Sequence, residues 1–211
     1  MQRIAFMLAL SLPLAPLACG KGQIDDKPKA EAQDAKPVDS KPASPDAKVA
    51  ALDAAASKVG FVGAKVTAEH EGSFGTIDGN ATFEGDKPVG LEITVKVDSL
   101  TIEPDKLQEH LLSPDLFDAA AHPEAKFVST SIQEKAGEGG TTHLVEGNLS
   151  LHGETKSISF PAKLEVSAGS AKGTAEFTID RKQFGIVYPG MPDDLIKDEV
   201  LLKLDLSFKR S

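Results

Sequence analysis

Residues 199–209 read EVLLKLDLSFK, and this stretch decides the fold class. Apolar side chains occupy alternate positions at Leu202, Leu204, Leu206 and Phe208. Charged or polar side chains lie between them, at Lys203, Asp205, Ser207 and Lys209. Successive side chains of an extended strand point to opposite faces, so this strand has one dry face and one wet face. Such one-sided polarity is typical of antiparallel sheet.

The same period of two extends back through most of the chain to Val59. It is clear where Leu91, Ile93, Val95 and Val97 alternate with polar residues. Eight such runs are predicted to be strands, at residues 61–71, 73–84, 89–100, 125–134, 142–152, 156–167, 172–181 and 199–209. Short separators such as HGET at 152–155 suit hairpins. Eight strands with one apolar face predict an all-β antiparallel barrel, because closure removes exposed edges.

One connection interrupts this succession of hairpins, the stretch PDKLQEHLLSPDLFDAAAHP at residues 104–123. Leu107 and Leu111 are four residues apart, which places both on one face of a helix. Ser113 and Pro114 have the residue types of a cap and a first helical position, and they predict a second short helix that ends before Pro123. We expect a short helical excursion between strands three and four that covers one end of the barrel.

The first 19 residues, MQRIAFMLALSLPLAPLAC, have the pattern of a secretory signal, with one basic residue, an apolar core and small residues before Cys19. Cys19 is the only cysteine, so it cannot form an internal disulfide. The stretch LACG at 17–20 resembles the acylation site of bacterial lipoproteins. We expect a signal peptide over residues 1–19 and lipidation of Cys19, with secretion as a soluble protein as the alternative.

Residues 20–58 are rich in Ala, Lys, Asp and Pro and contain no aromatic residue. Such a segment buries too little apolar surface to offset its ordering entropy, so we expect a disordered tether before a folded domain of residues 59–211. The net charge of the chain is −9. This acidic excess argues against nucleic acid or an anionic lipid surface as the main partner.

Several separated blocks of sequence carry a family resemblance. They are EHEGSFGTIDG at 69–79, HLLSPDLFDAAAHPEAKF at 110–127, VEGNLSLHGETKSISFP at 145–161 and IDRKQFGIVY at 179–188. In order and spacing they resemble the YceI-like family of bacterial polyisoprenoid-binding proteins, from Val59 to Arg210. The resemblance implies a secreted lipocalin-like barrel that holds a long lipid tail inside.

Catalytic and metal-binding chemistry finds little support in the residue pattern. The five histidines, His70, His110, His122, His143 and His152, form no pair at a metal-ligand spacing. No Gly-x-Ser-x-Gly nucleophile motif occurs. We therefore expect neither an enzyme nor a metal site, and no cofactor.

The barrel interior carries the functional hypothesis instead. The residues predicted to point inward are mostly small: Val62, Ala64, Val66, Ala68, Gly79, Ala81, Val95, Val97 and Ala175. An eight-stranded barrel can leave room for one ligand, and a core packed with side chains is the alternative. We expect the ligand-binding residues of the interior and mouth to be His70, Phe74, Val95, Val97, Phe117, Phe127, Leu149, Phe177, Arg181, Phe184 and Tyr188.

Two of these residues allow more than one interpretation. His70 is expected to be a neutral imidazole hydrogen-bonded inside the barrel, with contact to a ligand head group as the alternative. Arg181 is expected either to bind a quinone or phosphate oxygen at the mouth, or to pair with Asp180 or Asp198. The apolar loop at 183–195, QFGIVYPGMPDDL, is expected to be a lid or a plug.

Together these expectations describe a non-enzymatic protein, monomeric or homodimeric, that binds an isoprenoid lipid of the quinone or polyprenyl-carrier type. We expect it in the bacterial periplasm, anchored to the outer membrane. The alternative is a structural or protein-interaction module whose barrel is filled by its own side chains.

Overall fold

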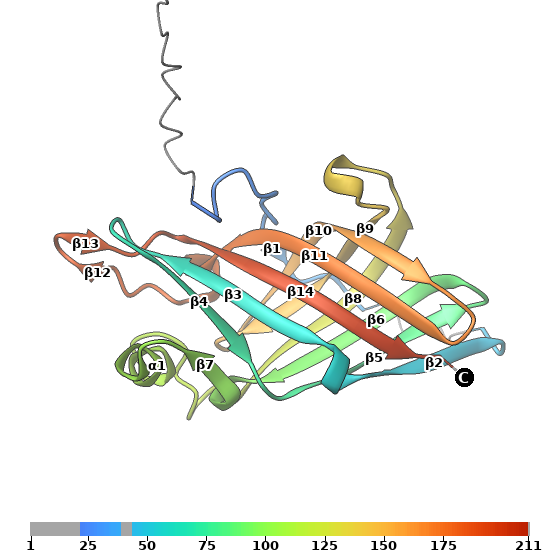
Figure 1. The fold of residues 1–211 in the computed structure, drawn as a ribbon, viewed down its shortest axis with the longest axis horizontal. Coiled ribbons are helices and arrows are strands. Elements are labelled where there is room, and N and C mark those ends of the chain that lie inside the picture. Colours follow the sequence, from blue (N-terminus) through green and yellow to red (C-terminus); the bar gives the residue numbers. More distant parts are fainter. Residues whose placement is uncertain (1–21, 39–43, 211) are drawn as a thin grey trace, which may run out of the picture.

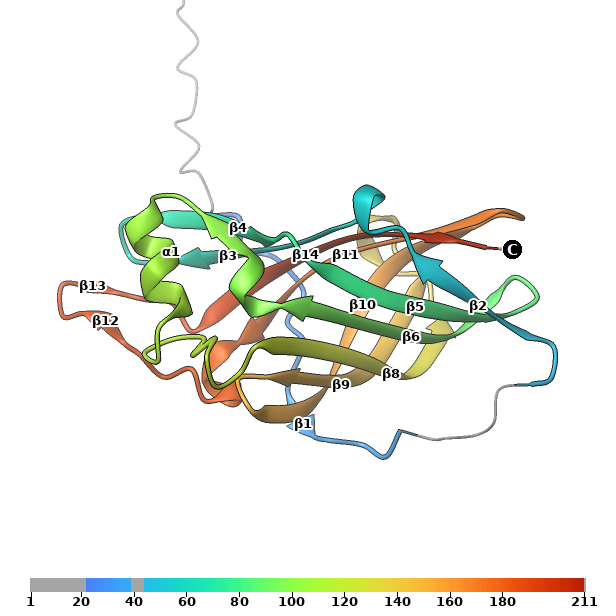
Figure 2. The same cartoon turned by 90° about the horizontal axis from the view of Figure 1, so that it is seen from below.

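The computed structural model describes residues 22–38 and 44–210, almost all of them within or alongside one antiparallel barrel (Figures 1 and 2). Its strands are β1 (Gln33–Asp34), β2 (Ala47–Leu52), β3 (Lys58–Ala64), β4 (Glu69–Phe74), β5 (Ile77–Glu84), β6 (Lys87–Lys96), β7 (Leu100–Ile102), β8 (Glu124–Glu134), β9 (His143–Leu151), β10 (Glu154–Val166), β11 (Ser170–Asp180), β12 (Gly190–Met191), β13 (Asp194–Leu195) and β14 (Glu199–Lys209). Its helix is α1 (Asp105–Leu112). The predicted signal peptide and Cys19 lie outside the described residues.

The predicted eight-stranded antiparallel barrel is confirmed, but three of its strands are each broken in two. A 3₁₀ turn at Ala54–Ala56 separates β2 from β3, and another at Val97–Ser99 separates β6 from β7. A bend at residues 75–76 separates β4 from β5. Around the barrel the order is β2/β3, β4/β5, β6/β7, β8, β9, β10, β11 and β14, and β14 pairs back to both β2 and β3.

The prediction of the first strand, at residues 61–71, was wrong. The chain reverses there in a turn that the Lys65 N–H closes by donating to the Ala68 carbonyl at 2.7 Å. Val66 lies in this turn and is 73% exposed, although it continues the apolar alternation of β3. The first barrel strand begins instead at Ala47, inside the segment predicted to be a tether.

The inward face of β3 was also predicted incorrectly, except for Ala64, which lines the cavity. Phe61 and Gly63 line the interior, whereas Val62 is buried on the outer side against Ile24 and Leu201. Residues 59–62 are all buried, so both faces of this strand are dry. Periodicity cannot identify the inner face of such a strand.

Residues 22–38, which we call the strap, pack along the barrel, so the prediction of a disordered tether was wrong here. The Ala30 N–H donates to the Thr178 carbonyl at 2.8 Å, and the Thr178 N–H donates to the Pro28 carbonyl at 2.9 Å. A few residues later β1 pairs with Ser157 and Lys156 of β10. The strap thus bonds to both β11 and β10.

The strap is ordered because it fills a gap in the hydrogen bonding between β10 and β11, which we call the seam. Strands β10 and β11 pair with each other only between residues 163–166 and 171–174. Beyond these residues β14 is the one barrel strand that β11 still pairs with, so β10 and β11 lack each other's hydrogen bonds where the strap lies. Ala30 is 2% exposed and joins the core cluster that contains Phe160 and Phe177. The composition of the strap alone did not reveal these partners.

Ala30→Asp is expected to release the strap, because an unpaired carboxylate buried in an apolar seam costs several kcal/mol. Limited digestion with the glutamate-specific protease Glu-C should then cut after Glu31 at least about tenfold faster than in the unmodified chain, reflecting the higher population of the open form. Ala35→Asp is the matched control, because Ala35 is exposed on the same segment. Equal digestion of the two variants would contradict the docked strap.

The helical excursion between β7 and β8 is confirmed as α1, but the second short helix is wrong. Residues 114–117 form turns. The Ser113 hydroxyl donates to the His110 carbonyl at 2.7 Å and so closes the end of α1 instead of beginning a new helix. Asp118 has a φ of 44°, which a right-handed helix does not allow.

Candidate functional site

The barrel encloses a cavity of about 450 Å³, so its own side chains do not fill it. It reaches the end of the barrel where α1, the β3–β4 turn at residues 65–68 and the β12–β13 hairpin lie (Figure 1). We call this end the mouth. The other end is packed with apolar side chains, among them Phe83, Leu206 and Phe208. The alternation in β14 and β6 predicted the wall correctly: Leu202, Leu204, Leu206, Leu91, Ile93 and Val95 all line the cavity.

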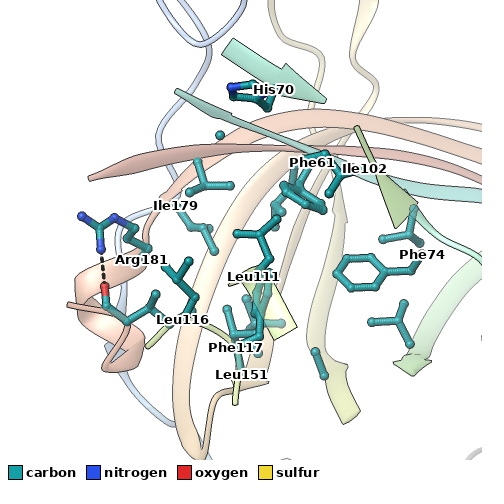
Figure 3. A pocket seen from close by; sticks show the side chains of 18 of the residues that line it. Phe61, His70, Phe74, Ile102, Leu111, Leu116, Phe117, Leu151, Ile179 and Arg181 are labelled. Carbon is teal, nitrogen blue, oxygen red and sulfur yellow. Dashed lines mark hydrogen bonds between the residues drawn. The ribbon is translucent and has the colours of Figure 1, made fainter. Parts of the chain in front are cut away.

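Two groups of phenylalanine rings form much of the wall. Near α1, the ring centroids of Phe61, Phe74 and Phe117 lie 5.7 to 6.3 Å from one another (Figure 3). By the strap, Phe160 stacks on Phe177 with centroids 4.1 Å apart. Aromatic rings bury large apolar areas in fixed geometries, so these phenylalanine rings give the cavity a defined shape.

Two positions in the blocks that carry the family resemblance, Gly72 and Gly147, leave no room for a side chain in this wall. A Cβ at Gly72 would lie 2.6 Å from the ring of Phe61, and one at Gly147 would lie 2.5 Å from the ring of Phe127. Each glycine therefore lets a ring from the neighbouring strand lie flat against its backbone.

Nine of the eleven predicted ligand-binding residues line this one cavity. They are His70, Phe74, Val95, Phe117, Phe127, Leu149, Phe177, Arg181 and Tyr188. The other two, Val97 and Phe184, are buried elsewhere and do not belong to the wall. Val97 falls in the 3₁₀ turn after β6, where the alternation of the strand ends. Phe184 packs in the core cluster beneath the strap.

Arg181 is 4% exposed and donates hydrogen bonds to backbone carbonyls of the loop that closes the mouth. Its Nη1 donates to the Ile186 carbonyl at 2.7 Å, and its Nε donates to the Lys197 carbonyl at 3.1 Å (one Arg181 bond is dashed in Figure 3). Nη2 also lies 3.5 Å from the carboxylate of Asp198. Burial lowers the pKa of Arg181, and the nearby Asp198 and Asp180 act in the opposite direction. Arg181 is thus neither the free head-group ligand nor the simple surface ion pair that the sequence suggested, but a clamp for residues 186–197.

Asp194 fastens the β12–β13 hairpin to the β3–β4 turn. Its carboxylate accepts from Lys65 Nζ at 2.8 Å and from the Thr67 hydroxyl at 2.9 Å. The backbone adds two bonds, from the Val66 N–H to Leu195 and from the Lys197 N–H to Ala64. The loop at 183–195 is therefore a lid held closed on the mouth.

We call the bonds that the Asp194 carboxylate accepts from Lys65 and Thr67 the Asp194 latch. Asp194→Asn is expected to loosen the lid, because it removes the negative charge of the acceptor from both bonds. Bonds to Lys65 and Thr67 lower the pKa of Asp194, so its contribution to closure is complete above the usual pKa of an aspartate and is lost as the pH falls through the lowered value. Amide hydrogen exchange at Val66 and Lys197 should rise severalfold in the variant at pH 7. In the unmodified chain it should rise, relative to unstructured amides, only below about pH 4.

Three polar side chains at the mouth, His70, His110 and Tyr188, take no part in the hydrogen bonds of Arg181 and Asp194 that hold the lid. His70 lines the cavity, and within residues 22–38 and 44–210 its imidazole has no hydrogen-bond partner, so the predicted internal hydrogen bond is not found. The rings of His110 and Tyr188 meet edge to face with centroids 5.1 Å apart. These groups offer hydrogen-bond donors and acceptors at the mouth of the apolar cavity.

Sequence reasoning missed several wall residues, including Phe61, Ile102, Phe160 and Ile179. Phe160 and Ile179 lie in correctly predicted strands and share the phase of other wall residues, so alternation was sufficient to find them. Phe61 was hidden by the two dry faces of β3.

The described part of the cavity wall contains no serine, threonine or cysteine. Across residues 22–38 and 44–210, no cluster of three or more His, Cys, Asp or Glu side chains is placed to hold a metal ion. No helix in these ranges combines the length and apolarity needed to cross a bilayer. The arrangement can hold an apolar molecule by burial.

Comparison with known proteins agrees with this architecture. The family model of the YceI-like domain matches residues 51–208, a range that includes most of β14 and the end of β2. A UPF0312 protein of Pseudomonas putida strain W619 is 35% identical over 127 residues, which is 56% of this chain and 65% of that protein. The match thus spans just under two thirds of the length of this relative.

Two solved structures share the fold. The crystal structure of Burkholderia cenocepacia BcnA has a TM-score of 0.64 and 25% identity, over 74% of this chain and 98% of that one. The structure titled as a polyisoprenoid binding domain from Saccharophagus degradans has a TM-score of 0.63 and 17% identity, over 77% of this chain and 98% of that one.

Proposed function

The chain belongs to the YceI-like family, and we propose that it binds a long-chain isoprenoid lipid, of the quinone or polyprenyl-carrier type, inside its barrel without catalysing a reaction. The observation that carries this proposal is the 450 Å³ cavity with a wall of apolar side chains drawn from almost the whole barrel. The polyisoprenoid-binding title of the Saccharophagus degradans structure supports the class of ligand.

Burial of the tail supplies the affinity. An apolar chain that loses several hundred Å² of accessible surface gains roughly 25 cal/mol per Å² before the costs of association. A total of about 10 kcal/mol leaves room for a micromolar dissociation constant, which corresponds to about 8 kcal/mol. No strong polar contact to the tail is needed.

The polar groups at the mouth suit an oxygen-bearing head group. Arg181 is already bonded to backbone carbonyls, which leaves His70, His110 and Tyr188 to meet the ligand. Imidazole and phenol groups can donate a hydrogen bond to a carbonyl oxygen, so they suit a quinone head group.

We further propose that the protein acts in the periplasm to sequester or carry its lipid, attached to the outer membrane through an acylated Cys19. The sequence pattern of residues 1–19 supports export. Replacing Cys19 by Ser should release the protein from the membrane fraction, and the same amount of membrane-bound protein in this variant would contradict acylation.

Native mass spectrometry of the full chain, followed by organic extraction, tests the lipid proposal. We expect a co-purifying species of discrete mass that is recovered in the organic phase and gives an isoprenoid fragmentation series. Protein that is ligand-free, and that takes up no added quinone or polyprenyl lipid, would overturn the proposal.

A further inference from the structure

Exposed apolar side chains gather at the mouth of the barrel. Among the described residues six large apolar side chains are exposed, and four of them lie here: Val66, Val187, Met191 and Leu195, each at least half exposed. We call these four the mouth rim. Val66 comes from the β3–β4 turn, and the others come from the lid. Exposed apolar groups that are gathered in one place indicate an interaction site more strongly than scattered ones.

The mouth rim is a fixed surface and borders the cavity directly. Val66 and Leu195 are joined by a backbone hydrogen bond of 3.2 Å, and the Asp194 latch holds the two loops together. Met191 is exposed and also lines the cavity, so wall and rim are continuous at this residue. An apolar molecule leaving the cavity past Met191 would pass the rim.

The start of the strap lies at this same end. The Gln23 N–H donates to the carboxylate of Glu69 at 3.1 Å, and Glu69 is the first residue of β4, next to the turn that carries Val66. Cys19 precedes Gly22 by three residues, and three residues span at most about 10 Å. Because the strap is packed on the barrel, it cannot act as the long spacer that its composition suggested.

We propose that the mouth rim docks on the surface of a phospholipid bilayer, with the cavity opening toward the lipid. The role of this contact rests on the proposed function, since it lets an apolar ligand pass between bilayer and barrel without crossing water. A short lipid anchor at Cys19 and an apolar rim on the same end act together, because one weak membrane signal alone gives marginal binding. The net charge of −9 opposes anionic lipid, so zwitterionic phosphatidylcholine is the surface that fits.

The chain contains no tryptophan, so a single introduced tryptophan reports its own surroundings. Val66→Trp places the probe on the mouth rim, outside the cavity wall, at a residue 73% exposed. Val49→Trp is the matched control, because Val49 is 63% exposed on β2 at the opposite end of the barrel (Figures 1 and 2). Both variants are made in the full chain, with and without Cys19→Ser.

Phosphatidylcholine vesicles containing brominated lipid then provide the measurement. We expect the emission of the Val66→Trp protein to shift to shorter wavelength and to be quenched at least threefold more than that of the Val49→Trp protein. Adding Leu195→Asp should remove this difference while the protein stays folded, since Leu195 is half exposed. The emission of Val66→Trp should also shift in the Cys19→Ser background. This shift should need a higher vesicle concentration, because the lipid anchor is then missing.

Equal quenching of the two probes in vesicle-bound protein would overturn the proposal. A rim that instead pairs two copies of the chain would also overturn it, and sedimentation would show this as a dimer that Leu195→Asp dissociates. Native mass spectrometry of the same variants distinguishes failure of rim docking from failure of the proposed lipid binding. Lipid that is still bound when the rim fails to dock leaves the proposed function intact, and docking by a barrel that takes up no lipid would contradict that function alone.

Discussion

Replacing Arg181 by Met is expected to lower the free energy of unfolding by about 3–6 kcal/mol, the largest loss of stability we expect from one side chain at the mouth. The variant keeps much of the side-chain volume but leaves the carbonyls of Ile186 and Lys197 without their charged donor. Hydrogen bonds to charged groups contribute about 1.5–3 kcal/mol each, and burial prevents water from replacing them fully. A domain of this size has only about 5–15 kcal/mol of stability in total.

Lys182→Met is the matched control for Arg181. Lys182 is the next residue and pairs with the same Asp198, at 2.9 Å, but its side chain is 46% exposed. Exposed ion pairs contribute about 0–1 kcal/mol, so this variant should unfold almost as the unmodified chain does. Urea unfolding followed by circular dichroism measures both variants. Similar losses in the two proteins would show that the charge near Asp198, and not the clamp on the lid, is what matters.

The clamp shows where reasoning from sequence ends. The sequence predicted Arg181 as the last residue of a strand beside the apolar loop, and it lies one residue beyond β11, at the start of a 3₁₀ turn. Its partners are carbonyl groups of residues 186 and 197, and any residue type supplies a carbonyl. No side-chain pattern could have marked them, so the sequence offered only a ligand oxygen or an ion pair with Asp180 or Asp198 as partners of Arg181.

The barrel itself was predictable for a different reason. Where a strand has one dry face, as β14 and β6 have, every second side chain records the direction of the interior. Leu204 and Ile93 therefore fell on the cavity wall as expected. Alternation does not identify the inner face where a second layer covers the outside of the barrel. Ile24 of the strap covers Val62 in this way, so both faces of the strand carry buried apolar residues.

Gly63→Phe is expected to reduce the lipid bound to the purified protein by at least about tenfold. Gly63 lines the cavity, and a Cβ placed there meets no atom within 4 Å, so a larger side chain enters open space. The new ring would occupy part of the volume in which the apolar tail is proposed to lie. A tenfold loss corresponds to about 1.4 kcal/mol, less than the gain from burying a few methylene groups. Filling empty space causes little of the strain of overpacking, so the variant should still fold.

Gly169→Phe is the control for this change. A Cβ at Gly169 also meets nothing within 4 Å, but this residue lies in the exposed turn between β10 and β11, away from the cavity wall. Lipid occupancy by native mass spectrometry and the melting temperature are compared for the two variants and the unmodified chain. A folded Gly63→Phe protein with an unchanged lipid load would place the ligand outside the barrel, whereas loss of lipid in this variant alone ties binding to the cavity.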